Sequence, residues 1–176
     1  MVSKLSLASK IIQFQLFRAF GFPKIMPVNI TVAVTNKCTS LCKTCNLGRN
    51  YIKNPKIADN DLKPEEYKKI FQNIGRNNVF WFVFSGAEPF MRKDIVEICK
   101  YAYDYCRPNV IVLPTNSLSP DIAPRVKELL EYCKKTIINV NLSLDGVEKD
   151  HDEIRGIKGN FEKVMTLYKE LKELKS

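Results

Sequence analysis

VNITVAVTNKCTSLCKTCNLG, residues 28–48, begins with an apolar, β-branched strand pattern and continues directly into three clustered cysteines. Cys38, Cys42 and Cys45 have the spacing C-x3-C-x2-C. Structural zinc is held by four protein ligands, and the iron–sulfur clusters of electron-transfer proteins are also usually held by four cysteines. Three thiolates on a four-iron cluster leave one iron open to another ligand. The spacing therefore indicates a metal site at which chemistry takes place.

Outward from this stretch, strand patterns alternate with helix patterns. Strands rich in β-branched or aromatic residues are predicted over 28–34, 79–84, 110–114 and 136–142. The segment 79–84 is apolar without a break, which is typical of a strand buried on both faces. Helices are predicted over 64–74, 92–106, 121–133 and 160–174, with Pro64 at a first helical position and Asn160 as an N-cap.

This alternation predicts an α/β fold with repeated βαβ units around a parallel sheet, either barrel-like or doubly wound. The pattern gives about four βα units, whereas a closed eight-stranded barrel typically needs about 250 residues. With 176 residues, the chain is expected to be an incomplete, open barrel or the N-terminal part of a longer protein. We assign residues 28–176 to this core domain, truncated at its C-terminus, and residues 1–27 to an N-terminal helix and linker.

The N-terminal segment 5–20 has the pattern of an amphipathic helix that ends at Gly21 and Pro23. The charged residues in and around this segment are all positive, namely Lys4, Lys10, Arg18 and Lys24. We expect the helix to pack against its own domain. Two alternatives stay open, because a basic helix with exposed Phe and Ile also suits a membrane surface or a partner.

The formal net charge of +9 comes from basic residues spread along the predicted helices, and the aromatics fall mostly inside apolar runs. This distribution favours solvated helix faces over a nucleic-acid surface, so no nucleic-acid partner is expected. Lys10 and Arg18 interrupt the N-terminal apolar stretch, which argues against a signal peptide, and no uncharged apolar run reaches about 18 residues. Six cysteines without a secretion signal predict reduced thiols in the cytoplasm.

Residues that are unusual for a core follow each predicted strand. The three cysteines follow the first strand, SGAEP (85–89) the second, Thr115-Asn116 the third, and SLDG (143–146) the fourth. The C-terminal ends of parallel strands form the edge at which α/β proteins place binding and catalytic groups. The four groups together therefore predict one common site.

Each group also has a simpler interpretation. Glu88 suits the first turn of a helix near Pro89, and both Thr115-Asn116 and the segment 143–146 suit ordinary turns. His151, the only histidine, lies among charges and is expected to be a solvated helix residue. Buried thiols are predicted for three cysteines in helices, Cys99, Cys106 and Cys133. A zinc site that uses His151 or one of these cysteines as the fourth ligand stays open.

Taken together, these residues resemble the radical S-adenosylmethionine (radical SAM) superfamily, from about Val28 to the end of the chain. The superfamily has C-x3-C-x2-C after the first strand of a partial (β/α)6 barrel, and a GGEP-type motif after the second, which residues 86–89 match. NLSLDG, HDEIRG and KGNF resemble the subgroup that often carries a C-terminal SPASM domain. The resemblance implies an enzyme with a partial, open barrel.

The resemblance also implies a mechanism. The three thiolates hold a [4Fe–4S] cluster, and SAM chelates the fourth iron through its methionine amine and carboxylate. One electron, from a donor such as ferredoxin or flavodoxin, cleaves SAM to a 5′-deoxyadenosyl radical that abstracts hydrogen from the substrate. The cofactor-binding residues that the resemblance implies are Gly86, Ala87, Glu88, Thr115, Asn116, Ser143 and Arg155. It implies no separate catalytic side chain.

Three residues depart from the family pattern. Ala87 replaces the second glycine of GGE, which requires that this position not need a positive φ. Ser117 stands where glycine is common after the TN pair, and Thr44 replaces an aromatic before the third cysteine. The substrate is expected to be a peptide, from the SPASM-like motifs, or a lipid at a membrane surface. The alternative function is a non-catalytic zinc or iron–sulfur binding module.

Overall fold

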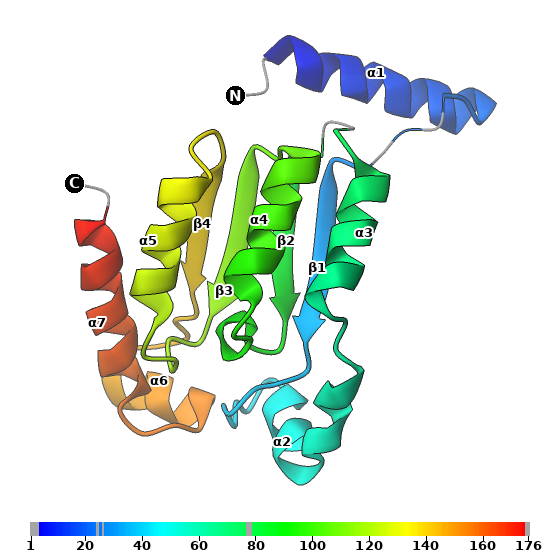
Figure 1. Cartoon of the computed structure of the whole chain (residues 1–176). Helices are drawn as coiled ribbons and strands as arrows, with labels where there is room; N and C mark the ends of the chain where they lie inside the picture. Colours follow the sequence, from blue (N-terminus) through cyan, green and yellow to red (C-terminus); the bar gives the residue numbers. More distant parts are fainter. Residues whose placement is uncertain (1–3, 24, 26, 77–78, 175–176) are drawn as a thin grey trace.

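The computed structural model describes residues 4–23, 25, 27–76 and 79–174. The described residues form a parallel sheet in the order β1-β2-β3-β4 (Figure 1). The strands are β1 Asn29–Thr35, β2 Trp81–Gly86, β3 Val110–Thr115 and β4 Ile137–Leu142. The helices are α1 Lys4–Phe20, α2 Leu47–Lys53, α3 Pro64–Ile74, α4 Ile95–Cys106, α5 Ile122–Tyr132, α6 Glu148–Arg155 and α7 Asn160–Glu173. Two 3₁₀ helices are η1 Pro55–Asn60 and η2 Pro89–Met91.

One face of the sheet carries the core. Helices α3, α4 and α5 lie across this face, and α7 runs beside α5 (Figure 1). Alternate strand residues such as Phe82, Phe84, Ile111 and Leu113 are fully buried beneath these helices. Adjacent strands run parallel because each returns through a helix on this same side, as expected for βαβ units. The predicted open α/β barrel with four βα units is confirmed.

The opposite face of the sheet is only partly covered. Trp81 is 39% exposed, and Ala33, Asn139 and Asn141 are also exposed on this side. The expectation that 79–84 is buried on both faces is therefore wrong for alternate residues. An unbroken apolar run does not specify which of the two faces a helix will cover, whereas helices here cover only the side of Phe82 and Phe84.

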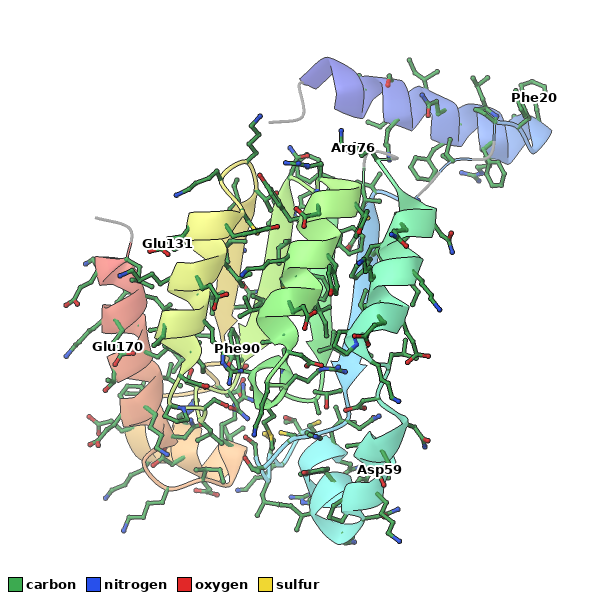
Figure 2. The ribbon with its side chains drawn as sticks, viewed as in Figure 1. Phe20, Asp59, Arg76, Phe90, Glu131 and Glu170 are labelled. Carbon is green, nitrogen blue, oxygen red and sulfur yellow. The ribbon has the colours of Figure 1, made fainter. Side chains whose placement is uncertain are left out.

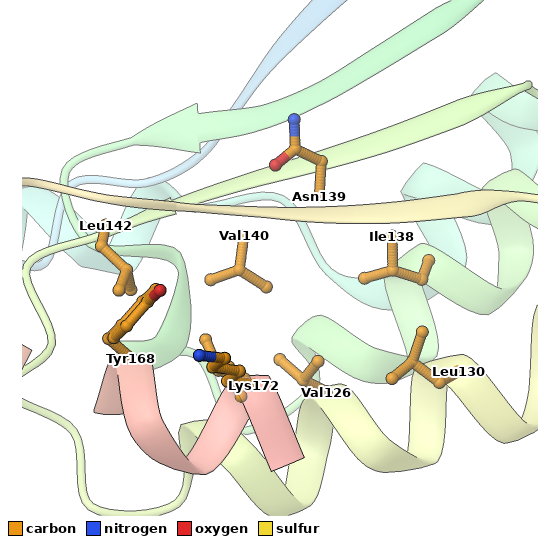
Figure 3. A pocket seen from close by; sticks show the side chains of 9 residues that line it. Val126, Leu130, Ile138, Asn139, Val140, Leu142, Tyr168 and Lys172 are labelled. Atoms are coloured by element: carbon orange, nitrogen blue, oxygen red, sulfur yellow. The ribbon is translucent and has the colours of Figure 1, made fainter. Parts of the chain in front are cut away.

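An apolar cavity of about 280 Å³ lies along β4, between α5 and α7. Figure 3 shows Ile138 and Val140 pointing into it, with Val126 and Leu130 of α5 opposite, while Asn139 points to the other face of the strand. This cavity is made of core-type side chains and lies apart from the groups at the strand ends.

The predicted strands and long helices are found within one to three residues of their expected bounds. Helix α4 begins at Ile95 instead of residue 92, because Pro89–Met91 forms η2 and Arg92 is extended. Helices α2 and η1 were not predicted from the sequence, and α6 was expected only as a helix around His151, without bounds. These elements are polar and short, so their apolar periodicity is weak.

Helix α1 lies at the N-terminal ends of the strands, away from the cysteine loop, residues 36–46, which carries the three clustered cysteines (Figure 1). Several of its apolar side chains face solvent, including Ile11, Ile12 and Phe17, and the terminal Phe20 is 78% exposed (Figure 2). The expected packing against its own domain therefore covers little of this helix. Among the described residues, no helix combines the length and apolarity required to cross a membrane.

Candidate functional site

The residues predicted from the strand ends surround one cavity. This cavity, of about 170 Å³, lies at the C-terminal edge of the sheet and draws its walls from the ends of β2 and β3 and from the segments that follow β1 and β4. It is lined by Cys38, Cys42, Cys45, Leu47, Ser85, Gly86, Ala87, Glu88, Pro114, Thr115, Asn116, Ser143 and Arg155. All the predicted metal and cofactor residues are among them. The structure brings these residues together, and their individual roles stay predictions.

Glu88 is the buried acid of this cavity, with 2% exposure. Its carboxylate accepts hydrogen bonds from Thr115 Oγ1 (2.9 Å) and from the backbone N–H of Asn116 (2.7 Å). It also accepts from the N–H of Phe90 (3.2 Å), so it caps η2 as the simpler interpretation expected. Burial raises the pKa of Glu88, although these donors and the nearby Arg155 oppose the shift. Glu88 thus ties the end of β2 to the end of β3.

Gly86 allows β2 to end directly against β1. Its φ is +105°, and a Cβ at this position would lie 2.5 Å from the carbonyl oxygen of Thr35. The next residue, Ala87, donates its N–H to the same oxygen (2.9 Å). Among the described non-glycine residues, a positive φ occurs at Arg107, Ser117 and Glu148. Ala87 therefore fits without strain in place of the family's second glycine.

Ser117 shows the opposite outcome. Its φ of 62° lies in the left-handed region, which favours glycine, and its Oγ is buried without a hydrogen-bond partner. The departure from the TNG pattern therefore places a strained residue directly after Thr115 and Asn116.

Each thiol of the cysteine loop has a nitrogen donor beside it. The N–H of Ser40 and Asn116 Nδ2 lie 3.4 Å and 3.8 Å from Cys38 Sγ. Arg155 Nη1 lies 3.7 Å from Cys42 Sγ. Burial raises the pKa of Cys38, and hydrogen bonds from the backbone and side chain of Ser40 oppose this. Donors aimed at sulfur would stabilise the thiolates that hold a bound cluster.

The third thiol, Cys45, is exposed and receives the N–H of Leu47 at 3.5 Å. Within the described part of the chain, no three Cys, His, Asp or Glu side chains are grouped as a site for a metal ion. The three thiols instead stand around the shared cavity. Such an arrangement of thiolates fits an iron–sulfur cluster, whose ligands bind different irons.

Helix α6 holds the cysteine loop from outside. The N–H of Lys43 donates to the carbonyl oxygen of Ile154 (2.8 Å), and Lys43 forms an ion pair with Glu153. Gly156, with φ +67°, ends the helix so close to the loop that a Cβ would lie 2.6 Å from the oxygen of Leu41. The HDEIRG motif supported the family resemblance, but nothing in its residue pattern predicted this contact.

Arg155, at the end of α6, was predicted to be a cofactor-binding residue. In the structure its Nε lies 2.6 Å from Asp145 Oδ2, an ion pair across the turn that follows β4. The Nε atom lacks hydrogen-bond geometry despite this distance. Asp145 therefore holds the guanidinium at the cavity wall beside Cys42, and the predicted role toward SAM stays a prediction.

The expectation for His151 is wrong. It lies on a helix, as expected, but its side chain is fully buried. Its Nδ1 accepts the N–H of Asp145 at 3.2 Å, and its Nε2 lies 3.2 Å from Asn160 Oδ1. Its neighbours in KDHDEIRG are charged and lie on other faces of the helix, so the sequence did not reveal that the position of His151 is buried. A single buried polar residue does not produce the apolar periodicity from which buried helix positions are predicted.

The expected N-cap is also different. Gly159 is the N-cap of α7, and Asn160 is its fully buried first residue. The carboxylate of Asp152 accepts hydrogen bonds from the N–H groups of Gly159 and Phe161. Asp152 therefore serves the capping role that was predicted for Asn160, and Asn160 is free to bond within the core.

The residues considered as a fourth zinc ligand are engaged elsewhere. Both ring nitrogens of His151 have protein partners. Cys99, Cys106 and Cys133 belong to the hydrophobic core, as predicted, with exposures of 0%, 2% and 1%. Burial raises the pKa of Cys106 to about 12 and that of Cys133 to about 11, so these thiols stay protonated.

The fold and the cavity together define an α/β protein with a partial, open barrel and a cavity lined by three thiols at the C-terminal edge of its sheet. A family model described as the Radical SAM superfamily matches residues 32–176. The chain therefore belongs to the radical SAM superfamily, whose cofactors are a [4Fe–4S] cluster and SAM.

Among curated relatives, the chain is 31% identical over 130 residues to Fe-coproporphyrin III synthase of Methanosarcina barkeri, a match that covers 73% of this chain and 30% of that protein. It is 28% identical over 153 residues to PqqA peptide cyclase of Bradyrhizobium diazoefficiens, which covers 85% of this chain and 37% of that one. The chain thus spans about a third of the length of these relatives.

Among solved structures, SuiB of Streptococcus suis bound to S-adenosylmethionine superposes with a TM-score of 0.71. The sequence identity is 18%, and the match covers 100% of this chain and 39% of SuiB. At this identity the likeness shows a shared fold.

Proposed function

We propose that this protein is a radical SAM enzyme that binds a [4Fe–4S] cluster through Cys38, Cys42 and Cys45. The proposal rests on one observation: the three thiols share a cavity with every strand-end residue that the family pattern assigns to SAM. When bound, the cluster and SAM supply a 5′-deoxyadenosyl radical for hydrogen abstraction. We assign this core to residues 28–176.

The residues around the cavity divide into donors and acceptors. An ammonium group needs an acceptor, which Glu88 offers through its carboxylate at the cavity wall. A carboxylate needs donors, which Ser143 and Arg155 offer from the β4 side. Thr115 and Asn116 hold Glu88 in place between these two sides. The arrangement therefore suits the two charged ends of an amino acid, such as the methionine part of SAM.

Anaerobic reconstitution with iron and sulfide tests this function. The proposal predicts a brown protein with about four irons per chain and conversion of SAM to 5′-deoxyadenosine when a reductant is added. A Cys42→Ser variant should lose the cluster, whereas Cys106→Ser, which changes a core thiol, should keep it. A colourless protein that retains one tightly bound zinc would support the alternative of a non-catalytic module.

For the substrate we propose a peptide. PqqA peptide cyclase is a relative, and SuiB has been crystallised with the precursor peptide SuiA. The exposed carboxamides of Asn139 and Asn141 lie on the uncovered face of the sheet, where they suit peptide groups. Deuterium transfer from a uniformly deuterated peptide into 5′-deoxyadenosine is the expected result. Deuterium transfer from a tetrapyrrole instead would favour a substrate of the kind in the name of the other relative, Fe-coproporphyrin III synthase.

We further propose a cytoplasmic location and an electron donor such as ferredoxin or flavodoxin. Six free cysteines suit a reducing compartment, and a net charge of +9 would attract an acidic carrier protein. Reduction of the reconstituted cluster by an acidic carrier should therefore slow as ionic strength rises. A reduction rate that does not change with salt concentration would contradict the proposal that opposite charges bring the carrier to this protein.

We also propose that α1 lies on an anionic membrane surface. Residues 1–58 contain nine Lys and Arg and no Asp or Glu, and the apolar side chains of α1 are exposed. The wild type should float with vesicles that contain phosphatidylserine and less with neutral ones. The double variant Ile12→Ser/Phe20→Ser should float less, while Ile137→Ser, an equally exposed site on β4, should behave as the wild type. Equal flotation of all three proteins would end the proposal.

A further inference from the structure

The orientation of the His151 ring is fixed by its partners. Because Nδ1 accepts the N–H of Asp145, this nitrogen carries the lone pair. Nε2 then carries the proton and donates it toward Asn160 Oδ1, 3.2 Å away. The ring is fully buried, so water does not supply alternative partners.

The bond from His151 in turn orients Asn160. With Oδ1 facing the ring, Nδ2 points the other way and donates to the backbone carbonyl oxygen of Asn116 at 2.9 Å. An amide flip would break both bonds inside the core, where unpaired polar groups are costly. Asn160 therefore connects His151 of α6 to the end of β3, with its side-chain amide held in a single orientation.

Asn116 uses all of its polar groups. Its N–H donates to Glu88 Oε2 (2.7 Å), and its Oδ1 accepts the N–H of Leu118 (3.0 Å). Its Nδ2 donates to Ser40 Oγ at 2.9 Å and lies 3.8 Å from Cys38 Sγ. Because Oδ1 is held by Leu118, the side chain can present only its N–H₂ group to the cysteine loop.

We propose that His151 is a positioning residue for the metal site: through Asn160 it fixes Asn116, whose side-chain amide donates toward the Cys38 thiolate. Hydrogen bonds to ligand sulfur stabilise the more negative, reduced state of an iron–sulfur cluster and raise its reduction potential. The inference rests on the proposed function, since it requires Cys38 to be a cluster ligand. The only histidine of the chain thus acts on the cluster from a distance.

The test is a redox titration of the reconstituted protein, followed by electron paramagnetic resonance (EPR). His151→Phe keeps an aromatic ring but removes both hydrogen bonds, and Asn160→Leu interrupts the next step. Both variants should shift the midpoint potential to more negative values, and the double variant should shift it no further than the larger single shift. His151→Gln, whose amide offers a donating N–H₂ group and an accepting oxygen, should restore most of the wild-type potential.

Thr136→Val is the matched control. Thr136 Oγ1 donates to the carbonyl oxygen of Pro108 (2.6 Å), a buried hydrogen bond at the N-terminal end of β4. This control should lower the melting temperature and leave the potential unchanged. An unchanged potential in cluster-loaded His151→Phe, or an equal shift in Thr136→Val, would overturn the inference. A wild type that takes up no cluster would instead overturn the proposed function on which it rests.

A measurement on the wild type does not depend on how variants fold. Nitrogen-15 NMR of the single histidine, with and without cluster, should show the proton on Nε2 and the lone pair on Nδ1. A ring protonated at Nδ1 would contradict the chain of hydrogen bonds, because Nε2 could then not donate to Asn160.

Discussion

Gly156 ends helix α6 directly against Leu41 in the middle of the cysteine loop, although α6 follows the last strand of the sheet and the loop follows the first. A Cβ on Gly156 would lie 2.6 Å from the Leu41 carbonyl oxygen and 2.8 Å from its Cβ. The loop that carries the thiols is thus shaped by a helix from the far end of the sheet. A side chain at position 156 should therefore disturb both the end of α6 and the cysteine loop.

Gly156→Ala should destabilise the protein and reduce its iron content. The left-handed backbone strain and the collision with backbone together should lower the free energy of unfolding by about 3 kcal/mol. Gly159→Ala is the control, because Gly159 also has a positive φ (+77°). Unlike at Gly156, a Cβ at Gly159 would have no atom of the described residues within 4 Å apart from its own chain neighbours, so this variant adds strain without a collision. It should lose about 1 kcal/mol and keep its iron. Equal iron loss in both variants would show that strain alone, and not contact with the loop, is responsible.

Glu88→Gln should weaken the link between the ends of β2 and β3. The carboxylate accepts three hydrogen bonds, whereas the amide replaces one acceptor with a donor that faces other donors. The free energy of unfolding in denaturant should fall by about 2 kcal/mol. Glu131→Gln, an exposed site on α5 far from the cavity (Figure 2), should change little. A stability equal to that of the wild type would mean that these bonds contribute nothing net.

Ser117→Gly should stabilise the protein. Ser117 has φ 62°, and its buried Oγ has no partner, so glycine removes both the strain and an unsatisfied hydroxyl. We expect a gain of about 1 kcal/mol in the free energy of unfolding, measured by chemical denaturation. Ser117→Ala keeps the strain but removes the hydroxyl, so it should gain less than glycine. A loss of stability in the glycine variant would contradict the assigned backbone conformation.

Asp152 should make the turn between α6 and α7 dependent on pH. Hydrogen bonds from the N–H groups of Phe161 and Gly159 lower the pKa of Asp152 below the ordinary value of 3.8. Its contribution to stability is therefore present above that ordinary value and is lost as the pH falls through the lowered pKa. Asp152→Asn should be less stable than the wild type at neutral pH, and the difference should shrink under acid conditions.

The control for this pH dependence is Asp59→Asn, an exposed position at the other side of the molecule (Figure 2). Its unfolding free energy should follow that of the wild type across the whole pH range. A constant gap between the wild type and Asp152→Asn down to low pH would show that the carboxylate charge is not what stabilises the turn.

The sequence predicted the sheet well because its strands are apolar and β-branched and its long helices carry clear periodicity. It also predicted which residues meet at the strand ends, since parallel strands bring their C-terminal ends to one edge. It did not predict the buried partners of these residues. His151 and Asn160 are polar, His151 lies among charged residues, and Asn160 bonds to Asn116, far back along the chain. Such pairings leave no local pattern.

The sequence also did not predict that one face of the sheet is only partly covered. The apolar run at 79–84 specifies a strand but not how many layers cover it. Trp81 and Phe82 are neighbours in sequence, and yet one is 39% exposed and the other fully buried. Only the placement of the helices on one side distinguishes them.

EPR of the reduced, reconstituted protein with and without SAM tests whether one iron of the cluster is open to the cofactor. Three cysteine ligands leave one iron open, so we predict a [4Fe–4S] signal that changes when SAM is added. Labelling the SAM amino group with nitrogen-15 should then produce a resolved coupling to the cluster. A cluster signal that SAM leaves unchanged would contradict the proposed three-cysteine site, because it would show that the fourth iron is not available to the cofactor.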